Sequence, residues 1–287
     1  MNATQQVPAT VAVIGGGRMG AGIAQVFAVQ GTHVSIAESD SAAAEAARSR
    51  LTDTLRKAAE RGKLAADLDV VLDRIVVVDE IGKLPADAGL VVEAVPERAD
   101  LKIAVLTKAE AVVGEDAVLA SNTSSLSIGE LGAALDAPSR FLGMHFFNPV
   151  PASKLVEVVY GPDTAEPVVH RAQEWVRALG KTDVVVRDSP GFATSRLGVL
   201  LGLEAIRMLE EDVADAKAID TAMELGYRHP MGPLRSTDLV GLDVRLAVAE
   251  YLQTTLGDRF APPQLLRDKV AAGELGRKTG RGFHDWK

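Results

Sequence analysis

Short runs of β-favouring residues alternate with Ala-rich helical segments from Thr10 to about Arg187. This alternation is typical of an α/β domain with a doubly wound, mostly parallel sheet between two layers of helices. The sequence leaves the direction of the last strands open. The expected strands are 11–15, 33–37, 74–78, 89–95, 117–121, 140–146, 154–160 and 182–188, and the expected helices are 18–31, 41–64, 99–114 and 166–180.

The pattern changes at the Asp-Ser-Pro-Gly sequence of residues 188–191. Beyond it, apolar residues recur at the i, i+3 and i+4 spacing of amphipathic helices, with Gly or Pro between the segments. We therefore predict an α/β domain over residues 1–188 and an all-helical domain over residues 189–287. The expected helices of the second domain are 192–212, 215–226, 237–257 and 262–273.

Composition and charge limit the possible partners. The chain has a formal net charge of −8 and no conspicuous cluster of lysine and arginine, which argues against broad nucleic-acid binding. It contains no cysteine, so disulfides, thiolate zinc sites and a cysteine nucleophile are excluded. No apolar run reaches membrane-spanning length, and the first residues lack the features of a signal peptide. We expect a cytoplasmic protein whose partners are small molecules or proteins.

A glycine-rich loop follows the first expected strand. Gly15, Gly17 and Gly20 match the G-x-G-x-x-G pattern, with a strand before it and a helix after it. Gly15 permits the tight turn, Gly17 lets the backbone approach a pyrophosphate, and Gly20 lets the helix pack on the strand. A glycine-rich turn without a ligand is the alternative, but the flanking elements favour a Rossmann-type dinucleotide site.

An acidic residue ends the second expected strand. Glu38 lies eighteen residues after Gly20, where a carboxylate accepts hydrogen bonds from the hydroxyls of the adenosine ribose. The same charge repels a 2′-phosphate, and no lysine or arginine follows within several residues, so NAD is preferred over NADP. Asp40 is the alternative residue for this role, because strand ends read from a sequence are uncertain by about two residues.

One histidine and one glutamate lie in two otherwise apolar runs. His145 occurs in 140–146 and Glu157 in 154–160, where an ionisable side chain needs a partner. Adjacent strands would bring the pair together, with the carboxylate fixing the tautomer of the imidazole and leaving its other nitrogen for proton transfer. A satisfied core histidine and a strand-edge glutamate are the alternatives. No third ligand stands at usable spacing, so no metal site is expected.

Five longer segments resemble the L-3-hydroxyacyl-CoA dehydrogenase family, and most of all its short monofunctional 3-hydroxybutyryl-CoA dehydrogenases. The resemblance covers essentially the whole chain and implies NAD-dependent oxidation of an (S)-3-hydroxyacyl-CoA to the 3-oxoacyl-CoA, and the reverse. It also implies that His145 and Glu157 form the catalytic pair. The segments are SNTSSLSI (121–128), GMHFFNPVPASKLVEVV (143–159), DSPGFATSR (188–196), HPMGPL (229–234) and GRKTGRGF (276–283).

The resemblance assigns two serines to the reacting end of the substrate. Ser124 matches the family serine that hydrogen-bonds the substrate oxygen; a turn or helix-capping serine is the alternative role, and Ser125 is the adjacent candidate. Ser195 stands where the family usually has an asparagine that holds the substrate carbonyl. Serine is shorter and has one donor instead of two, so this position bears on the preferred acyl group more than on the reaction.

Further residues are implied with the cofactor and with CoA. Glu97, Lys102, Asn148 and Lys278 match family positions near NAD; an exposed pair at a helix start is the alternative for the first two. Thr54 and Arg61, in the long helix after Glu38, match positions that contact the CoA adenine and phosphates, where serine and lysine are more usual. A solvated charged helix face is the alternative for these last two.

Other functions remain open at this level. The alternative substrates are a hydroxyacyl group on acyl carrier protein, hydroxyadipyl-CoA, and a free hydroxy acid or sugar acid. A non-catalytic NAD-binding protein is a further alternative. Apolar stripes in the helical domain favour a homodimer through that domain, as the family usually forms. Packing of the stripes on the NAD domain alone is the competing explanation.

Overall fold

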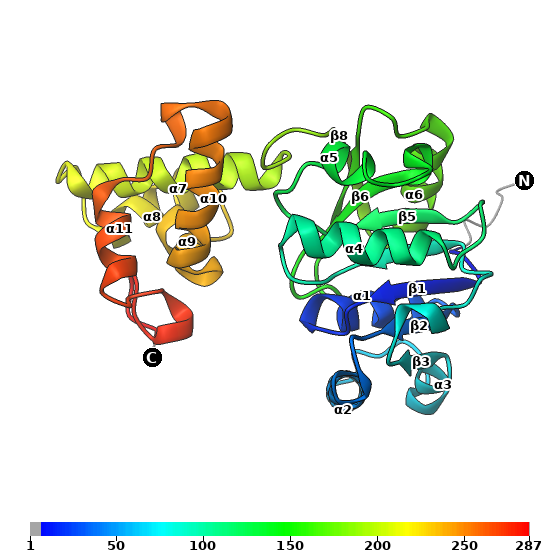
Figure 1. The fold of residues 1–287 in the computed structure, drawn as a ribbon. Helices are drawn as coiled ribbons and strands as arrows, with labels where there is room; N and C mark the ends of the chain where they lie inside the picture. Colours follow the sequence, from blue (N-terminus) through cyan, green and yellow to red (C-terminus); the bar gives the residue numbers. More distant parts are fainter. Residues whose placement is uncertain (1–6, 287) are drawn as a thin grey trace, which may run out of the picture. The chain divides into compact units, whose positions relative to one another are not determined.

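The computed structural model describes residues 7–286 of the chain. It divides into two compact units, Met1–Asp188 and Ser189–Lys287. The first unit contains the whole sheet and the second is helical, so the predicted fold class is confirmed (Figure 1).

Among residues 7–286, eight strands form one sheet in the order β3-β2-β1-β4-β5-β6-β7-β8. All neighbouring strands are parallel except β6 and β7, which are antiparallel and resolve the direction that the sequence left open. The strands are β1 (Thr10–Ile14), β2 (His33–Ala37), β3 (Ile75–Val78), β4 (Leu90–Glu93), β5 (Val118–Ser121), β6 (Phe141–Phe146), β7 (Leu155–Tyr160) and β8 (Thr182–Arg187).

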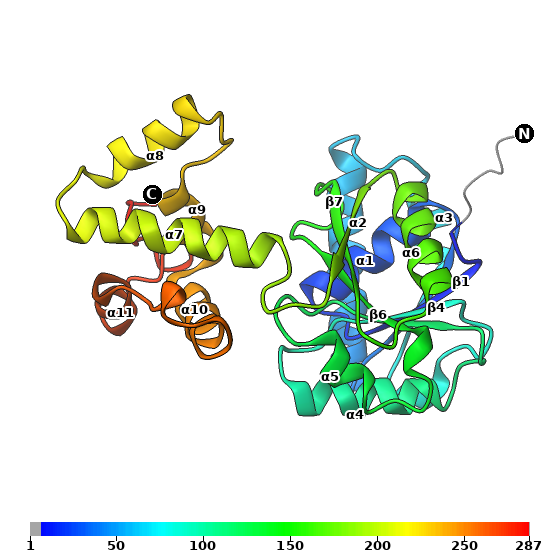
Figure 2. The same ribbon diagram turned by 90° about the horizontal axis from the view of Figure 1, so that it is seen from above.

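Helices cover both faces of the sheet because its central strands are apolar on both sides. Figure 2 shows α4 and α5 together on one face, opposite α1 and α6. On the α1 and α6 face, side chains such as Phe27 and Trp175 join the strands in one buried core. The helices of this unit are α1 (Arg18–Val29), α2 (Ser41–Glu60), α3 (Leu68–Asp73), α4 (Ala99–Glu110), α5 (Ile128–Gly132) and α6 (Glu166–Ala178).

The strand order reverses between β1 and β4, which are neighbours in the sheet. From β1 the chain continues outward to β2 and β3, whereas from β4 it continues in the other direction to β5 and β6. In open α/β sheets, ligands bind in the crevice beyond the carboxyl ends of the strands at such a reversal. The glycine-rich loop after β1 therefore lies at the expected ligand site.

The helical unit has its own hydrophobic core, which includes Leu203, Leu234, Leu252 and Phe260. One sequence prediction is wrong here: the expected helix 237–257 is two helices, separated at Gly241. Gly241 has φ +108°, a conformation that only glycine adopts readily, so the helix cannot continue through it. The helices of this unit are α7 (Thr194–Glu210), α8 (Ala216–Gly226), α9 (Pro233–Val240), α10 (Leu242–Leu256) and α11 (Gln264–Ala271).

Within residues 7–286, no helix combines the length and apolar character needed to cross a membrane.

Candidate active site

His145 and Glu157 are paired residues of the antiparallel strands β6 and β7. The imidazole Nδ1 lies 2.8 Å from Oε2 of Glu157, and the carboxylate is fully buried. A carboxylate so placed accepts the Nδ1–H hydrogen bond and stabilises positive charge on the ring. The two residues that the sequence singled out are therefore in direct contact.

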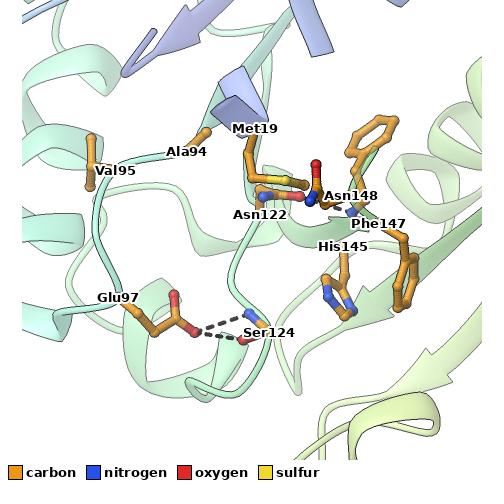
Figure 3. A pocket seen from close by; sticks show the side chains of 10 residues that line it. Met19, Ala94, Val95, Glu97, Asn122, Ser124, His145, Phe147 and Asn148 are labelled. Carbon is orange, nitrogen blue, oxygen red and sulfur yellow. Dashed lines mark hydrogen bonds between the residues drawn. The ribbon is translucent and has the colours of Figure 1, made fainter. Parts of the chain in front are cut away.

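His145 lines a cavity of about 330 Å³ in the first unit. Figure 3 shows Glu97, Ser124 and His145 around this cavity, with the ring of Phe147 beside the imidazole. The two ring centroids are 4.2 Å apart. The cavity thus presents a hydroxyl and an imidazole together, as proton transfer to or from an alcohol requires. Its lining residues are Met19, Ala94, Val95, Glu97, Asn122, Ser124, His145, Phe146, Phe147 and Asn148.

Glu97 organises the serine-rich loop after β5. Its Oε1 accepts hydrogen bonds from the Thr123 hydroxyl at 2.5 Å and from the Ser124 backbone N–H at 3.0 Å. The backbone N–H of Ser125 also donates to it, at 3.2 Å. Of the two serines considered from the sequence, Ser124 lines the cavity and Ser125 is not among its lining residues.

Lys102 is buried and faces protein carboxylates. Its Nζ lies 2.7 Å from Oε1 of Glu93 and 3.3 Å from Oε2 of Glu97, with only 1% of its side chain exposed. Burial raises the pKa of Glu97, but the charge of Lys102 and the hydrogen bonds from Thr123 and Ser124 outweigh it, so the pKa is below its usual value. Lys102 is thereby placed to hold Glu97, which in turn holds the Ser124 loop.

A second cavity, of about 530 Å³, lies over the glycine-rich loop and shares Met19, Ala94 and Val95 with the first. Gly15 and Gly17 line it, and a side chain on Gly17 would meet no atom within 4 Å, so this approach to the backbone is open. A Cβ on Gly20 would lie 1.8 Å from the carbonyl oxygen of Gly15. The open space at Gly17 is what a bound pyrophosphate requires. The lack of a side chain at Gly20 is what lets the first turn of α1 pack against the loop.

Glu38 also lines this second cavity. Its Oε1 accepts a hydrogen bond from the Gly16 backbone N–H at 2.6 Å. The carbonyl of the same Gly16 accepts a hydrogen bond from Nη1 of Arg50 at 2.7 Å. Asp40, the alternative to Glu38, instead caps α2 by accepting from Ala43 N–H. The carboxylate of Glu38, directly after β2 and beside the glycine-rich loop, therefore fits an acceptor for the ribose hydroxyls of a dinucleotide.

Besides Glu157 and Lys102, four residues implied by the resemblance line neither of these two cavities. Ser195 is in the first turn of α7, and Lys278 forms an ion pair with Asp243 at 2.5 Å; all three belong to the helical unit. Thr54 is exposed and donates to the Arg50 carbonyl within α2, and Arg61 is exposed directly after that helix.

The structure adds residues that sequence reasoning missed. Met19 and Asn122 line the first cavity, and the Asn122 Oδ1 accepts a hydrogen bond from Phe146 N–H at 2.8 Å. Asn122 follows β5 directly, so its place at the carboxyl end of a parallel strand was the signal that could have identified it. Arg50 gave no such signal, because it lies within a helix that is mostly exposed.

Comparison with known proteins settles the family. The family model for the 3-hydroxyacyl-CoA dehydrogenase NAD binding domain matches residues 10–189, and that for the C-terminal domain of the same enzymes matches residues 191–286. The chain belongs to the 3-hydroxyacyl-CoA dehydrogenase family. Its membership, inferred from the sequence motifs, and its NAD-binding domain are thus confirmed.

Relatives in this dehydrogenase family cover nearly the whole chain. The protein is 41% identical over 279 residues to the probable 3-hydroxybutyryl-CoA dehydrogenase of Bacillus subtilis, covering 96% of this chain and 97% of that one. A solved (S)-3-hydroxybutyryl-CoA dehydrogenase of Ralstonia eutropha is 40% identical, with a TM-score of 0.92 over 98% of this chain and 100% of that one. The 3-hydroxyadipyl-CoA dehydrogenase of Escherichia coli is 41% identical, over 97% of this chain and 59% of that protein.

Proposed function

We propose that the protein oxidises an (S)-3-hydroxyacyl-CoA, such as 3-hydroxybutyryl-CoA, to the 3-oxoacyl-CoA with NAD, and catalyses the reverse reaction. The observation that carries this proposal is the His145–Glu157 pair in a cavity that adjoins the dinucleotide crevice. An alcohol dehydrogenation requires a base beside a hydride acceptor, and this arrangement provides both places.

His145 is assigned as the general base. Since its Nδ1 bonds Glu157, Nε2 is the ring nitrogen that would take the proton of the substrate hydroxyl. Glu157 would stabilise the resulting imidazolium, because a buried carboxylate at 2.8 Å interacts strongly with that charge. Bound NAD would supply the hydride acceptor. In the reverse direction the imidazolium returns the proton.

Ser124 would donate a hydrogen bond to the reacting oxygen, held in place by Glu97 and, through it, Lys102. Gly15, Gly17, Gly20 and Glu38 would bind the adenosine and pyrophosphate end of NAD. Glu97 and Asn148, which line the cavity of His145, would lie beside the nicotinamide end of NAD. Lys102 would act there as a positioning residue.

The helical unit is assigned to substrate binding and dimerisation. Ser195 would hold the substrate carbonyl, and Lys278 would lie near the cofactor. Thr54 and Arg61, of the first unit, would contact CoA.

Apolar side chains exposed on α7, α9 and α10, among them Leu197, Leu239 and Val244, favour a homodimer. A monomer by light scattering at working concentration would argue against that interface. The cysteine-free composition supports a cytoplasmic location, which cell fractionation would test.

The decisive assay is NADH formation with purified protein, NAD and (S)-3-hydroxybutyryl-CoA, beside the R isomer and beside NADP. Turnover confined to the S isomer with NAD is the expected result. NAD binding without turnover of any hydroxyacyl thioester would contradict the proposal and favour a non-catalytic role. An acyl-carrier-protein thioester and free hydroxy acids, run in parallel, would reveal a different carrier.

A further inference from the structure

Three charged side chains of the first unit contact one another beside the cavity of His145. They are Glu93 at the end of β4, Lys102 in α4, and Glu97 between these two elements. Glu93 is fully buried and the Lys102 side chain is 1% exposed, whereas the Glu97 side chain is 37% exposed. Two carboxylates share one ammonium, so the three ionised groups together leave one negative charge without a counter-charge from among themselves.

The ammonium of Lys102 is bound more closely by Glu93 than by Glu97. Its Nζ lies 2.7 Å from Oε1 of Glu93, within a hydrogen bond, but 3.3 Å from Oε2 of Glu97. Attraction between opposite charges is stronger at the shorter distance and where water is excluded. The charge of Lys102 is therefore balanced mainly by Glu93, and the charge of Glu97 is balanced only in part.

Hydrogen bonds from two further residues fix Glu93 in this place. Its Oε1 accepts from the Val95 backbone N–H at 2.7 Å, and its Oε2 accepts from the Ser121 hydroxyl at 2.6 Å. These donors, with Lys102, replace the water that a fully buried carboxylate lacks. Glu93 thus holds the ammonium of Lys102 at a defined distance from Glu97.

The incompletely balanced charge faces the cavity of His145. Among the described residues that line this cavity, Glu97 provides the one carboxylate. Burial raises the pKa of Glu97, but its partners lower it further, so the carboxylate is ionised at neutral pH. Glu157 is paired with His145 and does not line the cavity. A cationic group bound in the cavity would therefore be stabilised by Glu97.

The two forms of the cofactor differ in charge at one end only, because the nicotinamide ring is cationic in oxidised NAD and neutral in NADH. We propose that Glu93 is a positioning residue that balances Lys102, keeps the Glu97 charge available to a cationic nicotinamide, and so favours binding of oxidised NAD over NADH. The inference rests on the proposed function, in which Glu97 lies beside the nicotinamide end of NAD. A site of this kind is less inhibited by NADH.

The test measures the dissociation constants of NADH and of oxidised NAD by calorimetry, without turnover, and compares their ratio, Kd(NADH)/Kd(NAD), between variants. Glu93→Gln should lower this ratio about tenfold, because Lys102 then balances Glu97. Glu97→Gln should lower it by a similar factor, since it removes the charge itself. Glu93→Asp, which keeps the charge on a shorter side chain, should retain most of the ratio of the unmodified protein.

Glu110→Gln is the matched control. Glu110 is also a buried glutamate of α4, but it accepts hydrogen bonds from the backbone N–H groups of Asp136 and Ala137 and lines neither cavity. Its replacement should leave the ratio unchanged. A purely structural defect weakens the binding of both cofactor forms alike, so the ratio separates an effect of charge from an effect of folding.

An unchanged ratio in Glu93→Gln would overturn the inference and leave Glu93 as a residue of the fold alone, with the proposed function intact. If Glu93→Gln does not fold, Glu97→Gln still decides, because the side chain of Glu97 is partly exposed and an unchanged ratio there would also refute the inference. A shifted ratio in a protein that turns over no hydroxyacyl thioester would instead refute the proposed function.

Discussion

Glu157 stands directly opposite His145 across β6 and β7, and its Oε2 lies 2.8 Å from the imidazole Nδ1. Direct cross-strand neighbours on one face of an antiparallel pair have their Cβ atoms close together, so the backbone register alone brings the two side chains into contact. Both side chains are held in a strand pair whose neighbours are apolar and buried. The geometry of the pair therefore depends on the sheet and not on a loop.

Replacement of Glu157 by glutamine should lower kcat about 10- to 150-fold, because a charge-assisted hydrogen bond to the imidazolium is lost. The amide has the same shape, so the melting temperature and the NAD dissociation constant should change little. Steady-state kinetics and fluorescence titration of NADH measure the two quantities. A normal kcat with weaker NAD binding would mean that Glu157 only shapes the cavity.

Replacement of His145 by glutamine should lower kcat by about 10²- to 10⁴-fold, the range for loss of a general acid–base. Single-turnover NADH formation separates this step from product release. Turnover at the normal rate in a correctly folded variant would exclude His145 as the base.

The ionised form of Glu97 should stabilise the fold above about pH 4.5. Its pKa lies below the ordinary value of 4.5, so its contribution is complete above that pH and is lost as the pH falls through the lower value of the folded state. The difference in melting temperature between the unmodified protein and Glu97→Gln should therefore narrow below pH 4.5. A difference independent of pH would show that the Glu97 charge is not what holds the Ser124 loop.

The two glycines at the start of α1 should respond differently to alanine. Gly17→Ala should keep the melting temperature, because its Cβ meets no atom within 4 Å, and should weaken NAD binding at least about tenfold by blocking the pyrophosphate. Gly20→Ala should destabilise the fold by about 1–3 kcal/mol or more, since its Cβ would overlap the Gly15 carbonyl. Unchanged NAD affinity in Gly17→Ala would place the phosphates elsewhere.

Replacement of Glu38 by serine should shift the NADP/NAD ratio of kcat/KM upward by about 10- to 100-fold. The carboxylate that repels a 2′-phosphate is removed, and Arg50, which bonds the Gly16 carbonyl at 2.7 Å, is near enough to attract that phosphate. Adding Arg50→Met should reverse much of the gain. An equal loss with both cofactors would show that Glu38 serves only the Gly16 turn.

Much of the fold could be predicted because its signals are local. Seven of the eight strands lie within predicted segments, β1 begins one residue before its segment, and the glycine-rich loop follows β1 as expected. The short helices α3 and α5 were not predicted, because their six and five residues are too few for a helical period to appear. The break at Gly241 was not predicted, because the apolar pattern continues across it. Only the backbone conformation of Gly241 separates α9 from α10.

The site was less predictable, because it depends on contacts between distant residues. Adjacent apolar strands suggested that His145 and Glu157 would meet, but only the antiparallel register places them opposite each other. From the sequence, Lys102 could equally be an exposed residue at the start of a helix. In the structure its ammonium is buried and pairs with Glu93 of β4 and with Glu97.

His145 and Glu157 belong to one strand pair of the first unit, whereas Ser195 belongs to a second unit with its own hydrophobic core. The residues assigned to proton transfer and those assigned to the acyl chain can thus accept mutations separately. If Ser195 serves the acyl chain as proposed, a lineage with this arrangement would acquire new substrates by changing the helical unit while the base and its carboxylate stay as they are. Exchange of the helical unit between relatives would then be a direct route to a dehydrogenase with altered acyl preference.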